Sequence, residues 1–428
     1  MRTRFFLALI LSGCAVDPEP IPLPEPAYGP GSQRPVVPPP PQEAVRLSIE
    51  RALDLADRSH PDLALQRARV EAAAGRAHQA GLLPNPVLLA RRESASLEGT
   101  TISQAEFLAG FSQRLPIGGR LGAATEAERR EVERLAREQD VRRLEIHSRV
   151  RGAFATALFA AEVARVNAET HDLARRAVDV ARLRRDAGDA TADEVARSEM
   201  EEIRSRLEVD KAQGLRDLAF VGLAAALGDA GLRIEAVEGS LERALDVPSV
   251  ESVLASLDGG VHAALARADL HAARARIDLA KAERIPDVTL DLFYRRLEVS
   301  DRNAFDIGIV VPLPLFDRNQ GRIREAQAES RAAEARGRAT RDEAVRRVRE
   351  AHVKLSEAVG HVRLVRDELL PKAAVVSRTA ETRYGAGDLS LAEILPIRRE
   401  AAAVRLAYLE GLREIMEAWG ELRLFLKP

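Results

Sequence analysis

The 428-residue sequence has a single cysteine, Cys14, one tryptophan and four tyrosines. One cysteine excludes a disulfide within the chain. Aromatic residues make up only 4% of the sequence, and the 64 lysines and arginines nearly balance the 66 aspartates and glutamates. The low aromatic content argues against a β-sandwich or an α/β enzyme, and the balanced charge indicates no nucleic-acid partner. Ala, Arg, Glu and Leu dominate instead, so a mainly α-helical protein is expected.

Proline is absent between Pro116 and Pro248, and helix-forming residues fill the stretch 117–184. A second such stretch, 317–383, is interrupted only by Pro371. At 1.5 Å per residue, each stretch predicts a helix of roughly 100 Å. Because helix propensity alone gives marginal stability, helices of this length need partner helices along their sides. Pro371 is expected to kink or loosen the second one.

Residues 1–13 have the pattern of a cleaved signal peptide. Two arginines precede the apolar run Phe5 to Leu11, which is too short to span a bilayer. Leu11-Ser12-Gly13-Cys14 resembles the bacterial lipobox, which implies cleavage before Cys14 and lipid modification of this residue. The alternative is a cysteine that lies by chance near an ordinary signal peptide. Ala15, rather than aspartate, follows the cysteine, and lipoprotein sorting then favours the outer membrane.

Residues 14–42 are expected to form a proline-rich tether. Eleven of the 24 residues from Pro18 to Pro41 are proline, which favours an extended spacer without a packed core. Recognition of this segment by a dedicated partner is the alternative, although the run is poor in charged and aromatic residues.

The rest of the chain divides into two repeats, residues 43–240 and 241–428. Matching signals recur about 200 positions apart: His60 and His262, Pro84 and Pro286, Ala187-Gly188-Asp189 and Ala386-Gly387-Asp388. Each repeat predicts the same order of elements. A helix is followed by a proline-bounded β-hairpin, a very long helix, a glycine turn and a further helix.

The β-hairpins are expected at residues 86–115 and 286–313. Apolar and polar residues alternate from Val288 to Leu292 and again from Phe305 to Leu313, as in strands with one exposed face. In the first repeat, Val87 to Glu93 gives a weaker strand signal. Each chain therefore supplies four amphipathic strands. In lipid every backbone group must be paired, and four strands are too few to close a barrel.

Two segments resemble the strand-to-helix junctions of the TolC-type outer-membrane efflux factors: Phe111-Ser-Gln-Arg-Leu-Pro-Ile-Gly-Gly-Arg120 and Ile309-Val-Val-Pro-Leu-Pro-Leu-Phe-Asp-Arg-Asn-Gln-Gly-Arg322. The run Pro-Leu-Pro-Leu-Phe-Asp-Arg-Asn-Gln-Gly within the second is most similar to the heavy-metal branch, the outer-membrane partners of cobalt-zinc-cadmium and copper efflux pumps. The resemblance extends over the chain from about Glu43 to Pro428.

This resemblance implies a homotrimer, in which four strands per chain close a 12-stranded transmembrane β-barrel that a periplasmic α-helical barrel continues. It also implies contact with outer-membrane lipid, a periplasmic adaptor (membrane fusion) protein and an inner-membrane, proton-driven pump of the RND type. No enzyme activity is expected, and no cofactor other than the covalent lipid on Cys14.

The turns at which the family docks its adaptor match two sets of residues: Arg184, Gly188, Asp189 and Thr191, then Arg383, Tyr384, Gly387, Asp388 and Ser390. Glycine suits a reversal between two helices because it readily takes positive φ, and Thr or Ser can cap the helix that follows. Arg383 and Tyr384 are further candidates for contacts between helices that hold the tip shut.

Glu393 is the candidate gate residue, with Glu194 at the matching place in the first repeat. The resemblance implies acidic rings near the tip, and three copies of Glu393 would form a ring of carboxylates that attracts cations. The next acidic position of the family is Pro396 in this chain. The alternative is that both glutamates are ordinary first-turn residues, which are favourable at helix N-termini.

Neither catalysis nor a resident metal is indicated. The eight histidines show no HExxH spacing, and no Ser-His-Asp set can be assigned from sequence. Three hypotheses remain: a duct for heavy-metal efflux, a duct of the same family for drugs or other solutes, and a purely structural periplasmic coiled-coil lipoprotein. The last would need no membrane strands.

Overall fold

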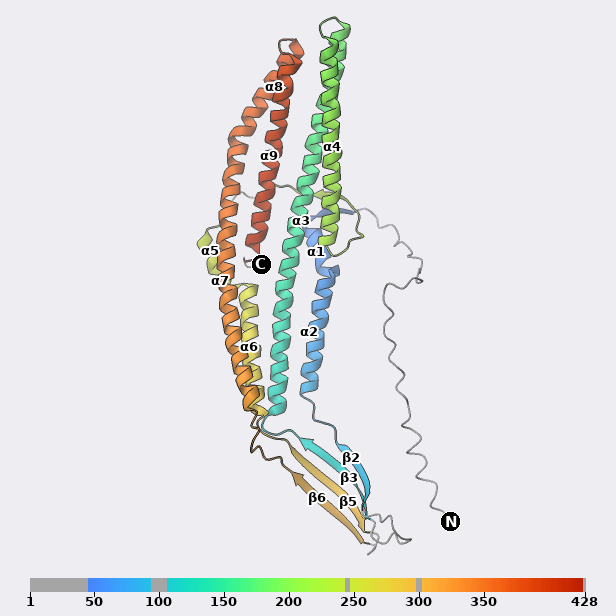
Figure 1. Cartoon of the computed structure of the whole chain (residues 1–428), viewed down its shortest axis with the longest axis vertical. Helices are drawn as coiled ribbons and strands as arrows, with labels where there is room; N and C mark the ends of the chain where they lie inside the picture. Colours follow the sequence, from blue (N-terminus) through green and yellow to red (C-terminus); the bar gives the residue numbers. More distant parts are fainter. Residues whose placement is uncertain (1–44, 94–105, 243–246, 298–301, 426–428) are drawn as a thin grey trace, which may run out of the picture. The chain divides into compact units, whose positions relative to one another are not determined.

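The computed structural model describes residues 45–93, 106–242, 247–297 and 302–425. The signal peptide, Cys14 and the tether, expected within residues 1–42, lie outside them. In chain order the elements are β1 (Val45–Ser48), α1 (Ile49–Ser59), α2 (Pro61–Ala80), β2 (Val87–Glu93), β3 (Glu106–Leu115), α3 (Arg120–Asp186), α4 (Ala192–Ala226), β4 (Ile234–Glu238), α5 (Val250–Ser256), the 3-10 turn Leu257–Gly259, α6 (Val261–Ala282), β5 (Val288–Leu297), β6 (Arg302–Val310), α7 (Gln320–Leu364), the π-helical turn Val365–Leu369, α8 (Leu370–Ala386) and α9 (Leu391–Arg423) (Figure 1).

Helix α3 is the longest element, with 67 residues in one unbroken helix, or roughly 100 Å. The expected span was 117–184. Seven of its 15 buried residues are alanines, including Ala127, Ala157 and Ala177, which lets neighbouring helices approach closely at these positions. It packs against α2 and α6 over its first half and against α4 and α9 over its second, as Figure 1 shows. Partner helices therefore line α3 along its length, as a helix of this length requires.

The matching helix of the second repeat, expected at 317–383, is divided in three. Helix α7 ends at Leu364, a π-helical turn covers Val365–Leu369, and α8 continues from Leu370. Pro371 is the cause, because its ring clashes with the carbonyl four residues earlier and its nitrogen has no hydrogen to donate. A wider turn just before it relieves both problems. The first repeat has no proline at this place and α3 stays regular.

A short parallel strand pair was not anticipated from the sequence. Val45–Ser48, expected to belong to a helix starting near Glu43, forms β1 and pairs with β4 in a two-stranded sheet. Four and five residues are too few to show a period against neighbouring helices. Leu47 is 1% exposed and packs into the main core, in which the middle of α3, the end of α4, α7 and the end of α9 also meet.

The second sheet has four antiparallel strands in the order β2-β3-β5-β6. Its two hairpins come from the two repeats, and β3 pairs with β5 over ten residues, from Glu106 opposite Leu297 to Leu115 opposite Val288. The hairpins were expected at 86–115 and 286–313, and the loops between their strands lie outside the described residues. Strands β2 and β6 are the edges, and within the described chain neither pairs with a further strand.

Asp287 ties this sheet to the helices. Its carboxylate is buried and accepts a hydrogen bond from Arg114 Nε of β3 at 2.5 Å, and Arg120 Nη1, at the start of α3, lies 3.0 Å away. One carboxylate thus joins the end of β3, the beginning of α3 and the residue just before β5. A buried charge is tolerated when it is paired in this way.

The core predicts a direct stability test. Leu355 of α7 is fully buried, so Leu355→Ala should lower the free energy of unfolding by about 2–5 kcal/mol through lost burial and the cavity left behind. The midpoint of thermal unfolding, followed by circular dichroism at 222 nm, measures the change. Leu65→Ala on α2 is the control, since Leu65 is 52% exposed. Equal effects of the two substitutions would show that Leu355 does not belong to a tightly packed core.

Candidate functional site

One face of the four-stranded sheet is apolar and uncovered. Leu88, Phe111, Leu292 and Ile307 lie opposite one another in a single row across β2, β3, β5 and β6. Their exposures are 69, 56, 52 and 80%. The neighbouring row contains Tyr294 and Phe305, whose rings meet edge to face. An apolar surface of this kind, continuous across every strand, marks a face made for contact with lipid or protein.

The opposite face of the same sheet is polar and internally bonded. Arg295 donates hydrogen bonds to Asp306 and Glu106, each at 2.7 Å, and so connects β5 to both of its neighbours. The Ser112 hydroxyl donates to Asp291 at 2.6 Å in the next part of this face. Period-two alternation therefore separates an apolar side from the side on which the charged residues Glu106, Arg295 and Asp306 lie. This is the pattern of strands in a membrane barrel with a polar interior.

The two glycine turns have the same backbone geometry. Gly188 and Gly387 have φ of +85° and +84°. In each turn the aspartate N–H donates to the carbonyl of an arginine five residues earlier, Asp189 to Arg184 at 2.8 Å and Asp388 to Arg383 at 2.9 Å. Only glycine takes this left-handed conformation without strain, which is why it ends both helices. The 199-residue repeat seen in the sequence thus recurs as an identical hydrogen-bond pattern.

In each of the two turns, the arginine side chain donates a hydrogen bond to a backbone carbonyl of the same turn. Arg184 Nη2 donates to the Asp189 carbonyl at 3.5 Å, and Arg383 Nη2 to the Asp388 carbonyl at 3.4 Å. Arg383 was a candidate for a contact between separate helices, but the hydrogen bond that it makes here stays within its own turn. Both bonds are long and exposed, and they leave the outer surface of the turns accessible.

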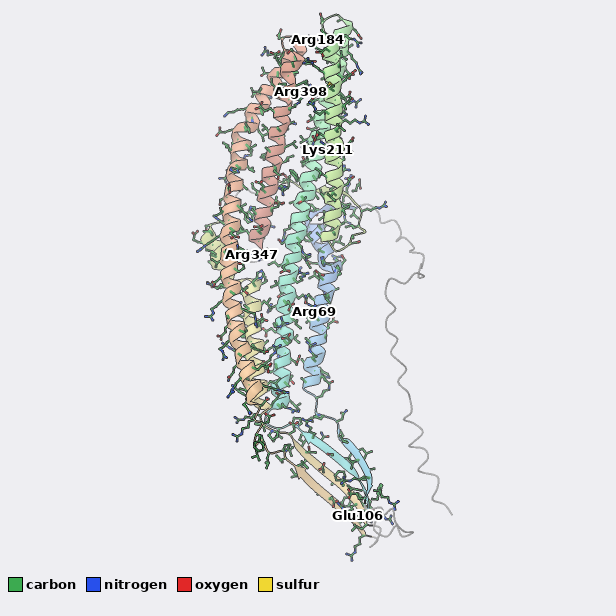
Figure 2. All side chains as sticks on the ribbon, viewed as in Figure 1. Arg69, Glu106, Arg184, Lys211, Arg347 and Arg398 are labelled. Atoms are coloured by element: carbon green, nitrogen blue, oxygen red, sulfur yellow. The ribbon has the colours of Figure 1, made fainter. Side chains whose placement is uncertain are left out.

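Tyr384 makes the contact between the two tips. It is 6% exposed, in a small cluster with Ala380, Leu389 and Ile394 between α8 and α9. The guanidinium of Arg184, labelled at the end of α3 in Figure 2, lies 5.9 Å from the centre of its ring. This distance is within the range of a cation–π interaction. The first helical hairpin therefore touches the second at their tips through Arg184 and Tyr384.

Glu194 and Glu393 have the contacts of helix caps. Glu194 accepts a hydrogen bond from the Thr191 N–H, and its own N–H donates to the Thr191 hydroxyl, both at 3.2 Å. Glu393 accepts from the Ser390 hydroxyl at 2.7 Å and from the Ser390 N–H at 2.9 Å. These two bonds lower the pKa of Glu393. Because the folded pKa is depressed, the cap stabilises the helix start above the ordinary glutamate pKa and is lost as pH falls through the lowered value.

Pro396, the position at which the family resemblance implies a second acidic residue, lies inside α9, in its second turn. A proline there leaves the helix short of one backbone donor. It contributes no charge. Glu393 is thus the acidic residue that this chain offers at the beginning of α9.

Sequence reasoning missed two rows of exposed apolar residues on the helices. On α4 these are Met200, Ile203, Leu207, Leu215, Leu218 and Val221, all at least 55% exposed. Val353 and Leu364 of α7 and Val375 of α8 are also more than half exposed. The spacing on α4 places its residues on one side of the helix. The signal was present as periodicity, but periodicity alone does not distinguish a side that packs within the chain from one that awaits a partner.

Among the described residues, no group of three His, Cys, Asp or Glu side chains is placed to hold a metal ion. None of the described helices is long and apolar enough to cross a membrane.

The model of the outer membrane efflux protein family matches residues 52–229 and 264–426 of the chain. The chain belongs to this family. The family resemblance of its strand-to-helix junctions is therefore confirmed. The chain functions as an outer-membrane efflux channel, and its family consists of efflux ducts. Membership in such a family counts against a purely structural coiled-coil lipoprotein.

The chain is similar to the cobalt-zinc-cadmium resistance protein CzcC of Cupriavidus metallidurans, with 27% identity over 88% of this chain and 90% of that protein. Among solved structures it is similar to CusC, with a TM-score of 0.69 and 18% identity, covering 89% of this chain and 92% of the other. It is also similar to the outer membrane protein VceC of Vibrio cholerae, with a TM-score of 0.67 and 19% identity, covering 88% and 95%. The two structures share the fold of this chain.

The turns predict a pair of opposite effects from one type of substitution. At Gly387 a Cβ would meet no atom within 4 Å, so Gly387→Ala adds only the cost of a left-handed backbone, about 1–2 kcal/mol. Gly385→Ala, two residues earlier in regular helix and equally unobstructed, should instead stabilise α8 by about 0.5–1 kcal/mol. Hydrogen exchange of the peptide spanning residues 380–395 should speed up in the first variant and slow down in the second. Equal exchange in both would contradict a strain-determined turn.

Proposed function

We propose that three copies of this chain form a duct through the outer membrane and periplasm that exports heavy-metal cations as the last component of a tripartite efflux system. The choice of heavy-metal cations as the cargo rests on the similarity of this chain to a cobalt-zinc-cadmium resistance protein over 90% of that protein's length. A duct for drugs or other solutes, built on the same fold, is the second candidate. The fold is shared with VceC and CusC and does not by itself identify the cargo.

The sheet supports a barrel closed by several chains. Edge strands β2 and β6 lack partners within the described chain, and an apolar face more than half exposed along a whole row needs lipid to cover it. In lipid an unpaired edge leaves several backbone donors and acceptors without partners, each at a cost of several kcal/mol. When strand β6 of one copy lies beside strand β2 of the next copy, the antiparallel order of the sheet continues from chain to chain. Four strands from each of three copies give a barrel of twelve.

The exposed rows on the helices support the same assembly. The apolar side of α4 and the exposed residues of α7 and α8 would face each other between neighbouring copies and close a helical wall. Within the chain, helices pack through small apolar residues such as the alanines of α3. The larger exposed apolar residues would pack between chains and complete a ring of helices. The polar face of the sheet would then line the barrel interior.

The same arrangement supports a placement in the cell. The sheet lies in the outer membrane, the helices extend into the periplasm, and lipid on Cys14 anchors the chain through the tether of residues 14–42. Since α3 runs for 67 residues from the sheet to Gly188, the turns lie roughly 100 Å from the membrane. The turns at 184–191 and 383–390 are the docking sites for a periplasmic adaptor, which connects them to an inner-membrane RND-type pump. Their exposed surfaces and uniform geometry support this role.

The assembly has a direct test. Leu218→Lys places a charge within the α4 row, where Leu218 is 67% exposed. Because the side chain is exposed within one chain, the monomer should still fold, but burying an unpaired lysine between copies should abolish the trimer. Native mass spectrometry in detergent measures the oligomeric state. Leu218→Met keeps the apolar area at the same position and should remain trimeric. A trimeric lysine variant would show that α4 does not face a neighbouring copy.

The candidate gate is tested by comparing the two repeats. Glu393→Ala should raise the passive single-channel conductance and weaken block by multivalent cations if three Glu393 carboxylates line a constriction. Glu194→Ala removes the equivalent cap from the first turn and serves as the matched control. An unchanged conductance in the Glu393 variant, or the same change in both, would assign Glu393 to helix capping alone.

The cargo is tested in cells that express the chain together with its adaptor and pump. Removing the channel gene should lower tolerance to cobalt, zinc and cadmium salts to the level of a strain that lacks the pump, while tolerance to apolar drugs should not change. Loss of drug tolerance with unchanged metal tolerance would favour the second candidate. Cys14→Ala, which removes the lipid but leaves the channel sequence intact, should weaken outer-membrane retention, as cell fractionation would show.

A further inference from the structure

A cavity of about 360 Å³ lies between the two helical hairpins, in the half of the helices that leads to the glycine turns. Helices α3 and α4 form one wall, and α8 and α9 the other. Its charged lining residues are Glu201, Arg378, Glu381, Arg398, Arg399 and Arg405. Four guanidinium groups therefore face two carboxylates. The rest of the lining is uncharged, consisting of alanine, serine, threonine and leucine, so no further acidic group of the lining offsets this excess of positive charge.

Arg398 is the unusual member of this set. Its Nε and Nη1 atoms are buried and have no hydrogen-bond partner. Figure 2 labels Arg398 on the upper part of α9. Facing the same cavity from α4, Ser198 is 1% exposed, and its hydroxyl oxygen is also without a partner. Two side chains from the two different hairpins thus have unused hydrogen-bonding capacity in one enclosed space.

Two of the nearby carboxylates are already occupied. Glu201 pairs with Arg399 and also with Arg204, and their side chains join α9 to α4. Glu169 pairs with both Arg165 and Arg405. Each of these two acids therefore pairs with two guanidinium groups, and neither is left to neutralise Arg398.

Glu381 lines the cavity but forms no ion pair with Arg398 within the described chain. Arg378 directs its Nε to the Ala374 carbonyl of its own helix, at 3.2 Å. It adds positive charge to the cavity without consuming an acid. A buried guanidinium without partners is costly, because removing charged donors from water is not repaid. The site therefore requires an occupant that accepts hydrogen bonds.

Water could satisfy the donors, but it cannot neutralise the charge. An oxyanion does both. The guanidinium is planar and presents pairs of parallel N–H groups that match two oxygens of a carboxylate, phosphate or sulfate group. Each such pair in Arg398 includes one of the two buried nitrogens. The cavity volume accommodates a small oxyanion together with several waters, each of about 30 Å³.

We propose that this cavity binds a small oxyanion, held by Arg398 of α9 and Ser198 of α4. The anion bridges the hairpin of the first repeat to that of the second, alongside the Arg399–Glu201 ion pair. None of the residues 184–191 and 383–390 of the two turns lines this cavity. Because Arg398 and Ser198 belong to different hairpins, any separation of these hairpins must release the anion or break half of its contacts.

Selenate is the probe, because selenium scatters anomalously and the ion has the geometry of sulfate. Crystals of the full-length assembly soaked in selenate should show an anomalous peak within hydrogen-bonding distance of the Arg398 guanidinium. No peak in the cavity, with ordered water beside Arg398 instead, would overturn the proposal. A neighbouring side chain found on Arg398 would overturn it as well.

Isothermal titration of detergent-solubilised protein with selenate provides the quantitative test. Arg398→Leu should weaken binding by roughly 10- to 100-fold, the usual effect of losing a charge-assisted hydrogen-bonded pair. Arg378→Leu removes a guanidinium from the same cavity that is bonded to its own helix, and it should change affinity by less than about threefold. Ser198→Ala should give an intermediate loss of less than about tenfold.

Equal losses in the Arg398 and Arg378 variants would mean that selenate responds only to general positive charge, and the assigned site would be wrong. The thermal midpoint separates folding from binding. Without selenate, Arg398→Leu should match or exceed the wild-type midpoint, because an unpaired buried charge has been removed. With selenate, only the wild type and the Arg378 variant should gain stability. These measurements need no adaptor, pump or metal, so their outcome does not depend on the proposed cargo.

Discussion

The requirement that every backbone polar group find a partner governs this molecule. Its four-stranded sheet has one polar face, one exposed apolar face and two edges that no described strand covers. The apolar face and the edges are unfavourable in a water-soluble monomer, because the apolar face promotes association and the edges are templates for further pairing. Placed in a membrane beside further copies, the same features are mutually consistent. The hydrogen-bonding requirement thus connects strand alternation, membrane location and assembly.

The internal repeat connects the sheet to the distant glycine turns twice. Each repeat contributes one hairpin to the sheet and one long helical pair, so a short strand motif is connected to a surface roughly 100 Å away. The two turns share the positive φ of their glycines and the backbone hydrogen bond from aspartate to arginine, yet the helices leading to them differ. Helix α3 is regular, whereas a π-helical turn precedes Pro371 in the second repeat. The second helical pair therefore contains an irregularity that the first lacks.

The contacts between the two repeats are apolar around the β1–β4 pair and mainly polar towards the glycine turns. Around the β1–β4 pair, large apolar side chains such as Ile146, Leu355 and Ile415 are fully buried. Towards the turns, the hairpins meet through charges: Arg399 with Glu201, Arg405 with Glu169, and Arg184 over the ring of Tyr384. Apolar burial fixes one region, while polar contacts that water or ions can replace join the other. Any relative movement of the hairpins is therefore easier towards the turns than at the core.

The sequence by itself determined the elements whose signal is local: the long helices from the absence of proline, the hairpins from alternation, and the turns from glycine. The repeated Ala-Gly-Asp turns and the junction motif also identified the family. The sequence left open which side of a helix remains uncovered, that Val45–Ser48 pairs with Ile234–Glu238, and that Arg398 and Ser198 share one cavity. Those facts depend on residues about 190 or 200 positions apart meeting in space. Local periodicity contains no information about such distant pairs, so only the tertiary structure decided them.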